Sequence, residues 1–519
     1  MDFNYCLKVL DAEQIRQADQ FTIKNEPIHS IDLMERASEE FARWFTALFD
    51  TEIPIVIFCG TGNNGGDGLV ICRLLNDAGY TVSLFCVGDP DSGSRDFKIN
   101  YDIIQNYDIP QTVIDQSNFP TLGKDTVIID AIFGSGLSRP ITGLIADLIN
   151  HLNAEPCEYR VAVDIASGLG CDSKFDGGAI MNASHTVCFQ VPKLSLLLPE
   201  NENQSGELII KSIGLIEEYI QSLSSNYYFS TLSFVRSFVK HRSRFSHKGR
   251  AGKNLLVAGS HGKMGAAILA GKACLRSGAG LLTMHTPGCG QNVLQNSVPE
   301  AMVMVDDQDQ LISNMHSISD FDVIGVGPGI GTDKMTAGAF KQILDQFDLP
   351  MVIDADALNI LSENKNWIEK IPEGSVLTPH PGEFRRLVGN WENDYDRLNK
   401  QIEFCAKHKV IILLKGANSS ICNPDGTVVF NATGNPGMAT GGSGDVLTGI
   451  LTALVGQGYN GFEAALLGAY LHGLAGDLFV KKNAEESLIA SDLLEYLPRA
   501  MRKIVYQQKV KKSERRRRI

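Results

Sequence analysis

Short apolar segments that alternate with amphipathic ones limit most strongly what this chain can fold into. Apolar segments of strand length recur in the first half, at positions 53–60, 81–88, 126–134 and 160–168. A stretch with helical periodicity, 68–79, separates the first two, so the pattern predicts a parallel sheet with helices on both faces. Two helical stretches, around 13–24 and 31–49, precede the first strand and indicate a helical cap or a dimer surface.

The same pattern starts again after a Ser-, Tyr- and Arg-rich connector at 214–253. Apolar segments follow at 253–260, 322–329, 350–358 and 410–417, with a small-residue helix expected over 264–276. Because 519 residues exceed what one hydrophobic core serves, two α/β domains are expected. We place them at 1–225 and 226–508, followed by a basic, solvated and irregular tail at 509–519.

Composition and charge exclude several functional classes. The chain is 44% hydrophobic with a net charge of -13, which is typical of a folded protein and argues against nucleic-acid or membrane partners. Eleven cysteines occur without CxxC pairs, and four lie in apolar segments where a free thiol acts as a small hydrophobe: Cys59, Cys86, Cys188 and Cys274. With an acidic N-terminal segment, this usage predicts a cytoplasmic protein.

The loop 60–68, GTGNNGGDG, follows an apolar strand and opens a helix, a place where main-chain amides suit a phosphate. Its glycines match GxGxxG, and Asp89 follows the next strand, so an ordinary dinucleotide-binding dehydrogenase is one alternative. A tight turn without a ligand is another. Side-chain oxygens from Asn63, Asn64 and Asp67 exceed what pyrophosphate binding requires and disfavour the dehydrogenase.

Polar turns end two further strands of the first half. Asp130, Asp164 and Ser167 are expected at the same carboxyl edge of the sheet as Asn64. These hard oxygen ligands suit a bound cation beside an anionic substrate. Taken singly, each carboxylate is more often a turn or helix-cap residue.

In the second half, the loop 435–446 runs into an apolar helix. Amides of Gly442, Ser443 and Gly444 are expected to face a transferring phosphoryl group, with Asp445 accepting a hydroxyl proton. The alternative is an aspartate that only caps its helix. No Walker loop competes, because 265–272 has the wrong glycine spacing before its lysine. His472 is expected to be a packed helix histidine.

Taken together, the motifs resemble the family of bifunctional NAD(P)H-hydrate repair enzymes over nearly the whole chain. The epimerase motifs of that family resemble GTGNNGGDG, DAIFGSGLSRP and VDIASG here. Its dehydratase motifs resemble AGSHGKMGAA, GVGPGIG, DADALN, LTPHPGEF, KGANS and NPGMATGGSGD. Many short matches in the right order are far harder to produce by chance than one.

The resemblance implies a Rossmann-like first domain that interconverts the R and S epimers of hydrated NADH and NADPH. It places a potassium ion near Asn64, Asp130 and Ser167, and acid–base assistance at Asp164 with help from Lys193. The residues implied to contact the hydrate are Asn63, Asn64, Gly65, Gly66, Asp67, Gly134, Ser135, Gly136, Leu137, Ser138, Arg139, Pro140 and Asp164. Ala166 departs from the family pattern, which has proline there, and frees a backbone torsion beside Asp164.

For the second domain the resemblance implies a ribokinase-like dehydratase fold that uses magnesium with ADP in bacterial members or ATP in eukaryotic ones. The nucleotide-binding residues implied are Lys415, Gly416, Ala417, Asn418, Ser419 and Gly444. The residues implied to line the hydrate site are Ala266, Gly329, His380 and Asp445. Phosphorylation of the ring hydroxyl, with Asp445 as base, would make it a good leaving group and restore NAD(P)H.

Alternatives remain open for both halves. The second domain could be a ribokinase-like small-molecule kinase, and the first a non-catalytic binding module. His380 could be a loop histidine that only caps a turn. A homo-oligomer is expected.

Overall fold

The computed structural model describes residues 3–315 and 317–516, with side chains described up to 506. The chain divides into two compact units. The first unit is Leu7–Tyr227; the second combines the described residues of 1–6 and 228–519. This division lies close to the expected boundary at 225, but the first residues of the chain pack with the second unit. Which activity each range carries stays a prediction.

The first unit is built on a parallel sheet. Its strands are β2 (Ile55–Gly60), β3 (Val82–Val87), β4 (Gln111–Val113), β5 (Val127–Ala131), β6 (Tyr159–Val163), β7 (His185–Phe189) and β8 (Glu207–Lys211). They follow the order β4-β3-β2-β5-β6-β7-β8, and every neighbouring pair is parallel, as predicted. The chain reverses direction across the sheet between β2 and β5, the place where ligands bind in such sheets.

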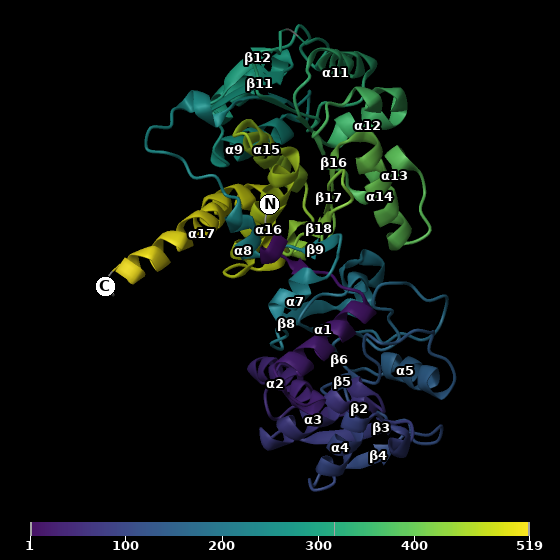
Figure 1. Ribbon diagram of the computed structural model, residues 1–519. Helices are drawn as coiled ribbons and strands as arrows, with labels where there is room; N and C mark the ends of the chain where they lie inside the picture. The colour runs from purple at the N-terminus through teal and green to yellow at the C-terminus, as the bar shows by residue number, and fades with distance from the viewer. Residues whose placement is uncertain (1–2, 316, 517–519) are drawn as a thin grey trace. The chain divides into compact units, whose positions relative to one another are not determined.

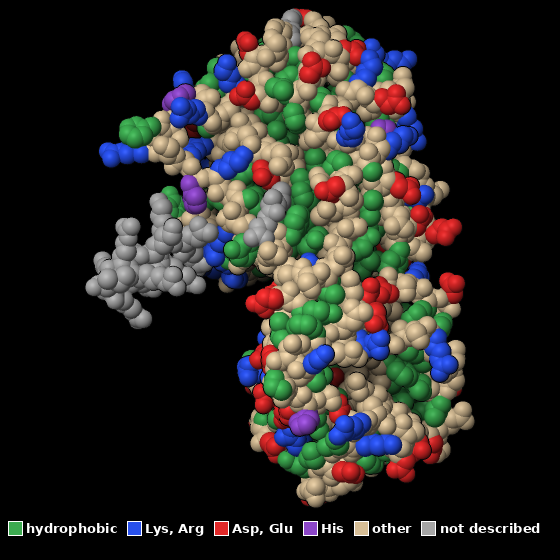
Figure 2. All heavy atoms as spheres, viewed as in Figure 1, with side chains coloured by type: hydrophobic (Ala, Val, Ile, Leu, Met, Phe, Trp, Pro, Cys, Tyr) green, Lys and Arg blue, Asp and Glu red, His purple; other side chains and the backbone are tan. Residues whose placement is uncertain are grey.

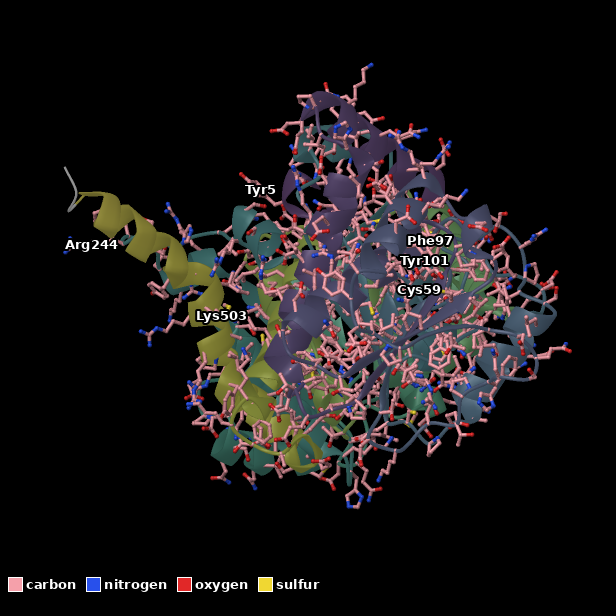
Figure 3. The ribbon with its side chains drawn as sticks, turned by 90° about the horizontal axis from the view of Figure 1, so that it is seen from below. Tyr5, Cys59, Phe97, Tyr101, Arg244 and Lys503 are labelled. Atoms are coloured by element: carbon pink, nitrogen blue, oxygen red, sulfur yellow. The ribbon has the colours of Figure 1, made fainter. Side chains whose placement is uncertain are left out.

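Helices cover both faces of this sheet. They are α1 (Ala12–Asn25), α2 (Ser30–Leu48), α3 (Asn63–Asp77), α4 (Arg95–Ile104) and α5 (Leu144–Ala154), with the short α6 (Glu202–Ser205) and α7 (Glu217–Ser222). Successive residues of β2 point to opposite faces: Ile57 packs with the cluster under α1 to α4, and Phe58 with the cluster under α5. Figure 3 labels Cys59 of β2 and Phe97 of α4, which share the first of these clusters.

Helix α3 lies unusually close to strand β2. A Cβ added at Gly65 would come within 1.6 Å of the carbonyl oxygen of Gly60, so no side chain fits there. A Cβ at Gly66 would meet the Met34 side chain at 2.6 Å. These glycines therefore set the position of the α3 N-terminus at the carboxyl edge of the sheet.

The second unit has a larger, mixed sheet. Its strands are β10 (Lys253–Val257), β11 (Leu281–Thr286), β12 (Met302–Val305), β13 (Val323–Val326), β14 (Met351–Ile353), β15 (Val376–Leu377), β16 (Ile411–Leu414), β17 (Ser420–Cys422) and β18 (Val428–Phe430). The order from β18 is β18-β17-β16-β15-β14-β13-β10-β11-β12. Strands β10 to β16 pair in parallel, whereas β17 and β18 are antiparallel. The short strands β1 (Leu7–Lys8) and β9 (Tyr227–Phe229) lie at the unit boundary in sequence.

A buried helix, α15, organises the second unit. The helices are α8 (Leu232–Ser237), α9 (Met264–Arg276), α10 (Gln291–Ser297), α11 (Lys334–Gln346), α12 (Ala355–Glu363), α13 (Pro381–Val388), α14 (Asp394–His408), α15 (Ser443–Gly456), α16 (Gly461–Val480) and α17 (Ala490–Arg516). Helix α15 packs against α9 and α16 (Figure 1). A Cβ at Gly449 would come within 2.1 Å of the Ala270 carbonyl oxygen, so the small residues of α9 and α15 permit this close contact. None of the helices in the described ranges is both long and apolar enough to cross a membrane.

The first residues of the chain complete the core of the second unit. Phe3 stacks on Tyr228 and Phe234, with ring centroids 4.6 and 5.4 Å apart. Cys6 is 2% exposed and belongs to the same apolar cluster as Phe234. The Thr231 hydroxyl also donates to the Tyr5 carbonyl (Tyr5 is labelled in Figure 3). The N-terminal segment is therefore part of the second hydrophobic core.

The cysteines are free as predicted, whereas the chain end differs from its prediction. The eleven cysteines are free and, apart from Cys289, buried, as predicted. Lys, Arg, Asp and Glu side chains are interspersed on the face drawn in Figure 2. The irregular tail predicted at 509–519 is wrong for 509–516, because α17 continues to Arg516; 517–519 lie outside the described residues. A helix anchored by Leu493 and Leu497 extends easily through Lys, Arg, Gln and Glu, which are good helix formers.

Candidate functional sites

A cavity of about 590 Å³ lies at the carboxyl edge of the first sheet. Helices α1, α2 and α3, the loop after β5 and the ends of β6 and β7 contribute to its wall. Most of the residues predicted to contact the hydrate line it: Asn63, Asn64, Asp67, Gly134, Ser135, Gly136, Leu137, Ser138, Arg139 and Asp164. Gly65, Gly66 and Pro140 do not; the two glycines allow α3 to pack closely instead.

Asp164 occupies a strained turn directly after β6. Its φ is +69°, in the left-handed region, and the Ile165 amide donates to the Val163 carbonyl at 2.9 Å across it. Such a three-residue turn is rare for a residue other than glycine, and strain of this kind concentrates at functional sites. The Asp164 amide donates to Val187 O at 2.8 Å, and its carboxylate accepts from the Phe189 amide at 3.1 Å. Strand β7 therefore holds the turn in place.

Lys193 is the buried partner of Asp164. Its side chain is 0% exposed, and its ammonium donates to Asp164 Oδ1 and, at 3.2 Å, to Cys188 Sγ. Burial, the largest single influence, lowers the pKa of Lys193, but attraction to Asp164, its hydrogen bond to that carboxylate and the nearby Cys188 and Cys171 together raise the pKa above its ordinary value. The lysine therefore stays charged and neutralises Asp164. The resemblance implied that Lys193 assists Asp164, and that catalytic role stays a prediction.

Two acidic residues in the cavity wall were not expected from the sequence: Asp19 of α1 and Asp96 of α4. Burial, and next the negative charge of Asp164, raise the pKa of Asp19 to about 7, against the opposing charge of Lys193. Burial also raises the pKa of Asp67 well above its ordinary value, with Asp164, Asp19 and Asp96 adding to the shift. The cavity therefore concentrates carboxyl groups.

A signal for Asp19 was present in the sequence. It lies four residues from both Ile15 and Ile23, so it interrupts the apolar face of its helix. Ile15 and Ile23 line the cavity with it. An acid in an apolar stripe is the pattern that would have identified this residue.

The residues expected to hold a cation lie together beside the cavity. Asp130 is 0% exposed and accepts from the Ser167 amide at 2.8 Å and the Ser167 hydroxyl at 2.6 Å. Burial raises the pKa of Asp130 to about 6, although the Ser167 hydrogen bonds oppose the shift. Asn64 donates from Nδ2 to Val163 O at 2.8 Å, while its buried Oδ1 has no hydrogen-bond partner among the described residues. Buried polar atoms are normally satisfied, so Asn64 Oδ1 is an open ligand position.

In the second unit, Asp445 lies in the first turn of α15, after Gly442. Gly442 has a φ of +90°, which favours glycine and turns the chain sharply into the helix. Asp445 is half-buried, and burial followed by repulsion from Asp354 raises its pKa to about 6, against attraction to Lys415. The positive end of the α15 helix dipole also lies beside this carboxyl, because Asp445 is in the first turn of the helix.

Lys415 lies over the start of α15. A Cβ added at Gly444 would lie 3.3 Å from Lys415 Nζ, so the two residues predicted to bind nucleotide are brought together. Lys415 Nζ lies 2.7 Å from Asp354 Oδ1, and Thr448 donates to Asp354 Oδ2 at 2.6 Å. Asp354, whose side chain is 2% exposed, therefore orients the lysine. Neither Asp354 nor Thr448 was predicted, although Asp354 opens the DADALN motif.

The other predicted nucleotide-binding residues form the hairpin loop between β16 and β17. The Gly416 amide donates to the Ser419 hydroxyl at 3.2 Å, which in turn donates to the Gly416 carbonyl at 3.0 Å. These bonds close the loop, with Ala417 and Asn418 at its tip.

The residues predicted to line the dehydratase hydrate site lie in different local settings. Ala266 and Gly329 are neighbours, because a Cβ added at Gly329 would lie 3.1 Å from Ala266 Cβ. His380 caps α13: its Nδ1 accepts from the Gly382 amide at 3.0 Å, as the capping alternative expects. Its side chain is 53% exposed and its Nε2 lies 3.4 Å from Glu383 Oε1. Contact of these residues with a hydrate stays a prediction.

Comparisons with known proteins cover both units. Residues 254–499 match the family model described as NAD(P)H-hydrate dehydratase, and residues 30–195 match that of the YjeF-related protein N-terminus. A bifunctional NAD(P)H-hydrate repair enzyme of Moorella thermoacetica is 36% identical over 515 residues, 96% of this chain and 97% of the relative. The chain belongs to the family of bifunctional NAD(P)H-hydrate repair enzymes.

Other members of this repair-enzyme family match over similar lengths. The relative from Thermofilum pendens is 33% identical, covering 96% of this chain and 95% of its own, and that from Escherichia coli is 32% identical, covering 94% and 93%. A solved ADP/ATP-dependent NAD(P)H-hydrate dehydratase of Bacillus subtilis, co-crystallised with ATP and Mg²⁺, is 32% identical over 53% of this chain and 98% of that one, with a TM-score of 0.48. The predicted family, α/β fold class and two-activity repair function are confirmed by the family matches.

His472 makes one contact that its sequence context did not predict in this member of the repair-enzyme family. Its Nε2 lies 3.3 Å from the hydroxyl of Ser443, in the first turn of α15. Burial lowers the pKa of His472 to about 4, so the ring is neutral. It is a packed helix histidine, as expected, but it also contacts the start of α15 that carries Asp445.

Proposed function

We propose that the chain repairs hydrated NADH and NADPH in two reactions. The first unit interconverts the R and S epimers, and the second dehydrates the S form with ADP or ATP as phosphoryl donor. The observation that carries the second assignment is the half-buried Asp445 at the start of α15, beneath a lysine held by Asp354. Family membership over nearly the whole chain supports both assignments.

In the dehydration, the ionised Asp445 accepts the proton of the ring hydroxyl while that oxygen attacks the phosphoryl group. The amides at the start of α15 and the Lys415 ammonium stabilise the negative charge on the phosphoryl oxygens. Departure of phosphate then restores the reduced ring, because phosphate leaves far more easily than hydroxide. The adenine nucleotide binds, in this proposal, at the loop Lys415–Ser419.

Magnesium in the second unit fits the residues present as a companion of the nucleotide. No cluster of three His, Cys, Asp or Glu side chains suited to a metal occurs in the part of the chain that the structure describes. Mg²⁺ usually binds through one or two carboxylates together with substrate phosphates, and Asp445 and Asp356 are half-buried carboxylates at this site. When bound, the ion neutralises phosphate charge.

In the epimerisation, Asp164 is the proposed acid–base group at the hydrated ring, paired with the buried Lys193 ammonium. A cavity of about 590 Å³ has the size of a small-molecule site. We propose a potassium ion at Asn64, Asp130 and Ser167, where the unpartnered Asn64 Oδ1 and the buried Asp130 carboxylate fit a cation. The bound ion would supply positive charge beside the anionic substrate.

We also propose a cytoplasmic location and a homo-oligomeric state. The free thiols, all buried except Cys289, and a substrate derived from reduced dinucleotides support the location. We expect no nucleic-acid or membrane partner, in line with the net charge of -13.

Turnover of purified protein tests the proposal directly. With Mg²⁺ and either ADP or ATP, hydrated NADH should recover the absorbance of the reduced cofactor; recovery with neither nucleotide would reject dehydration. A stable phosphorylated product without elimination would instead support a ribokinase-like kinase. Comparing the two nucleotides also identifies the preferred donor.

A further inference from the structure

The first-unit cavity contains carboxyl groups that have no role in the epimerisation proposed above. Asp19, Asp67 and Asp96, from α1, α3 and α4, share the cavity wall with Asp164. Asp164 has a buried lysine as its partner, whereas Asp19 has no hydrogen bond or ion pair of its side chain among the described residues. Asn64 Oδ1, buried and unpartnered in the same wall, indicates independently that this cavity receives a ligand or ion.

Asp19 and Asp164 affect each other although they come from separate elements. Burial and the charge of Asp164 raise the pKa of Asp19 to about 7, against Lys193. Near neutral pH, Asp19 is therefore protonated in a large fraction of molecules while Asp164 is matched by the lysine charge. Two carboxyl groups in different surroundings, one paired with a lysine and one not, are a recurring basis of acid–base chemistry.

We propose that Asp19 is a second catalytic residue of the epimerase, the general acid that works with Asp164 as general base. This inference rests on the proposed epimerase function and adds a residue to it. It assigns to α1 a chemical role beyond covering the sheet.

The reaction balances without any added reagent. Hydration of the reduced ring places a hydroxyl on the carbon beside the ring nitrogen. The nitrogen lone pair forms a double bond to that carbon as the carbon–oxygen bond breaks, and protonated Asp19 gives its proton to the departing oxygen, which leaves as water.

Water then adds to the other face of the same carbon. Its oxygen forms the new bond, the nitrogen recovers its lone pair, and Asp164 accepts the proton that the adding water releases. Nothing is oxidised or reduced. The enzyme ends with its proton on Asp164 and catalyses the reverse epimerisation from that state, or exchanges the proton with solvent.

The other charged groups around the cavity suit this role less well. Asp67 lies on α3, where burial raises its pKa well above its ordinary value and the charges of Asp164, Asp19 and Asp96 add to the shift. A general acid works best when its pKa lies near the operating pH. Arg16 and Arg139 also line the cavity but are exposed, and Arg16 pairs with Glu13 at 2.6 Å. Asp96 lies in the first turn of α4.

The test uses the full chain with purified R epimer and no ADP or ATP, so that dehydration cannot consume the product. Formation of the S epimer is followed by chromatography, with spontaneous epimerisation subtracted. Wild-type rates should fall as pH rises through about 7, because the acid loses its proton. Asp19→Asn should slow epimerisation by about 100-fold and remove this decline.

Controls separate a chemical role from a structural one. Asp77→Asn, at the exposed end of α3, should leave the rate and its pH profile unchanged. Asp19→Glu keeps an acid at the position and should restore part of the rate with a shifted decline. Dehydration of the S epimer with nucleotide should be equal in all variants, which shows that the second unit is intact.

The outcomes are distinct. A wild-type protein that epimerises, together with an Asp19→Asn variant of equal rate and equal pH profile, would overturn the inference. Loss of the decline in Asp67→Asn instead would assign the acid to α3 and also overturn it. Absence of epimerisation in the wild type would refute the proposed epimerase function itself.

Discussion

The two sites lie in separate α/β units, and the charged groups around their aspartates differ. In the first unit, a strained turn after β6 places Asp164 in the wall of a cavity that other acids also line, with a buried lysine as its partner. In the second, Asp445 starts a buried helix beneath Lys415, in a half-exposed position. Exchange of protons needs paired carboxyl groups shielded from water, whereas phosphoryl transfer needs amides and cations that stabilise developing negative charge.

Asp445→Asn should have the largest effect on activity, and only the activity of the second site should be lost. Dehydration should fall by about 100-fold or more, because the variant lacks the positioned base. Epimerisation by the first unit should not change. Turnover of the S epimer with ADP or ATP measures the first quantity, and Asp348→Asn, an exposed residue of the second unit, is the matched control. Full activity of Asp445→Asn would show that the residue only caps its helix.

The two sites should also respond to pH in opposite directions. Asp445 must be ionised to act as a base, and its pKa is about 6. Dehydration should therefore fall about tenfold for each pH unit below about 6, as the protonated fraction increases. Epimerisation should fall at higher pH, above about 7. Initial rates of each reaction across this range check both; a dehydration rate independent of pH down to about 5 would contradict the role of Asp445.

Lys193→Met should disable the first site while leaving the second intact. Removing one member of a buried ion pair leaves the other charge uncompensated, which costs on the order of 3 kcal/mol. We expect slower epimerisation and a lower unfolding temperature of the first unit. Calorimetry and epimer assays measure these, with the exposed Lys174→Met as control. If stability and epimerisation both match the wild type, the pair has neither role.

Phe3→Ala should destabilise the second unit and leave the first unit unchanged, the reverse of Lys193→Met. The reason is that the Phe3 ring packs on Tyr228 and Phe234 of the second unit. Loss of these ring contacts should cost about 1–2 kcal/mol. Thermal inactivation should occur earlier for dehydration than in the wild type, with epimerisation unchanged. Tyr5→Ala, which removes a half-exposed ring from the same segment, is the comparison. Equal inactivation in Phe3→Ala and wild type would show that the segment adds nothing to this core.

Ala166→Pro should have the smallest effect. Proline at this position would restrict the unfolded chain and stabilise the first unit by about 0.4–1 kcal/mol if the native torsion suits it. Ala166 is fully buried, two residues after the strained Asp164. Calorimetry of the first unit provides the measurement, and destabilisation would show that the alanine is required by local packing.

Much of both sites was predictable because it depends on local chemistry. Gly60 and Gly65 predict a strand-to-helix turn. An aspartate after a run of small residues predicts the start of α15. The carboxyl ends of parallel strands meet at one edge, so Asp130, Ser167 and Asn64 were expected to be neighbours. The motifs of the family added the roles.

Other residues could not be assigned because their settings come from distant segments. For Asp19 the sequence marks an acid in the apolar face of its helix, but only the folded chain shows that this face lines the cavity with Asp164. Asp354 meets Lys415 and Thr448 only when β14, β16 and α15 come together. The helical end of α17 was missed because a run of charge describes solvation and not backbone conformation.

The sequence alone determined the alternation of elements, the glycine turns and the family, because periodicity and close backbone approach are properties of neighbouring residues. Only the tertiary structure decided which carboxyl groups share one cavity, which lysines neutralise them, and that residues 3–6 complete the second core. Burial and charge–charge interactions depend on distances in space, and chain order does not contain these distances.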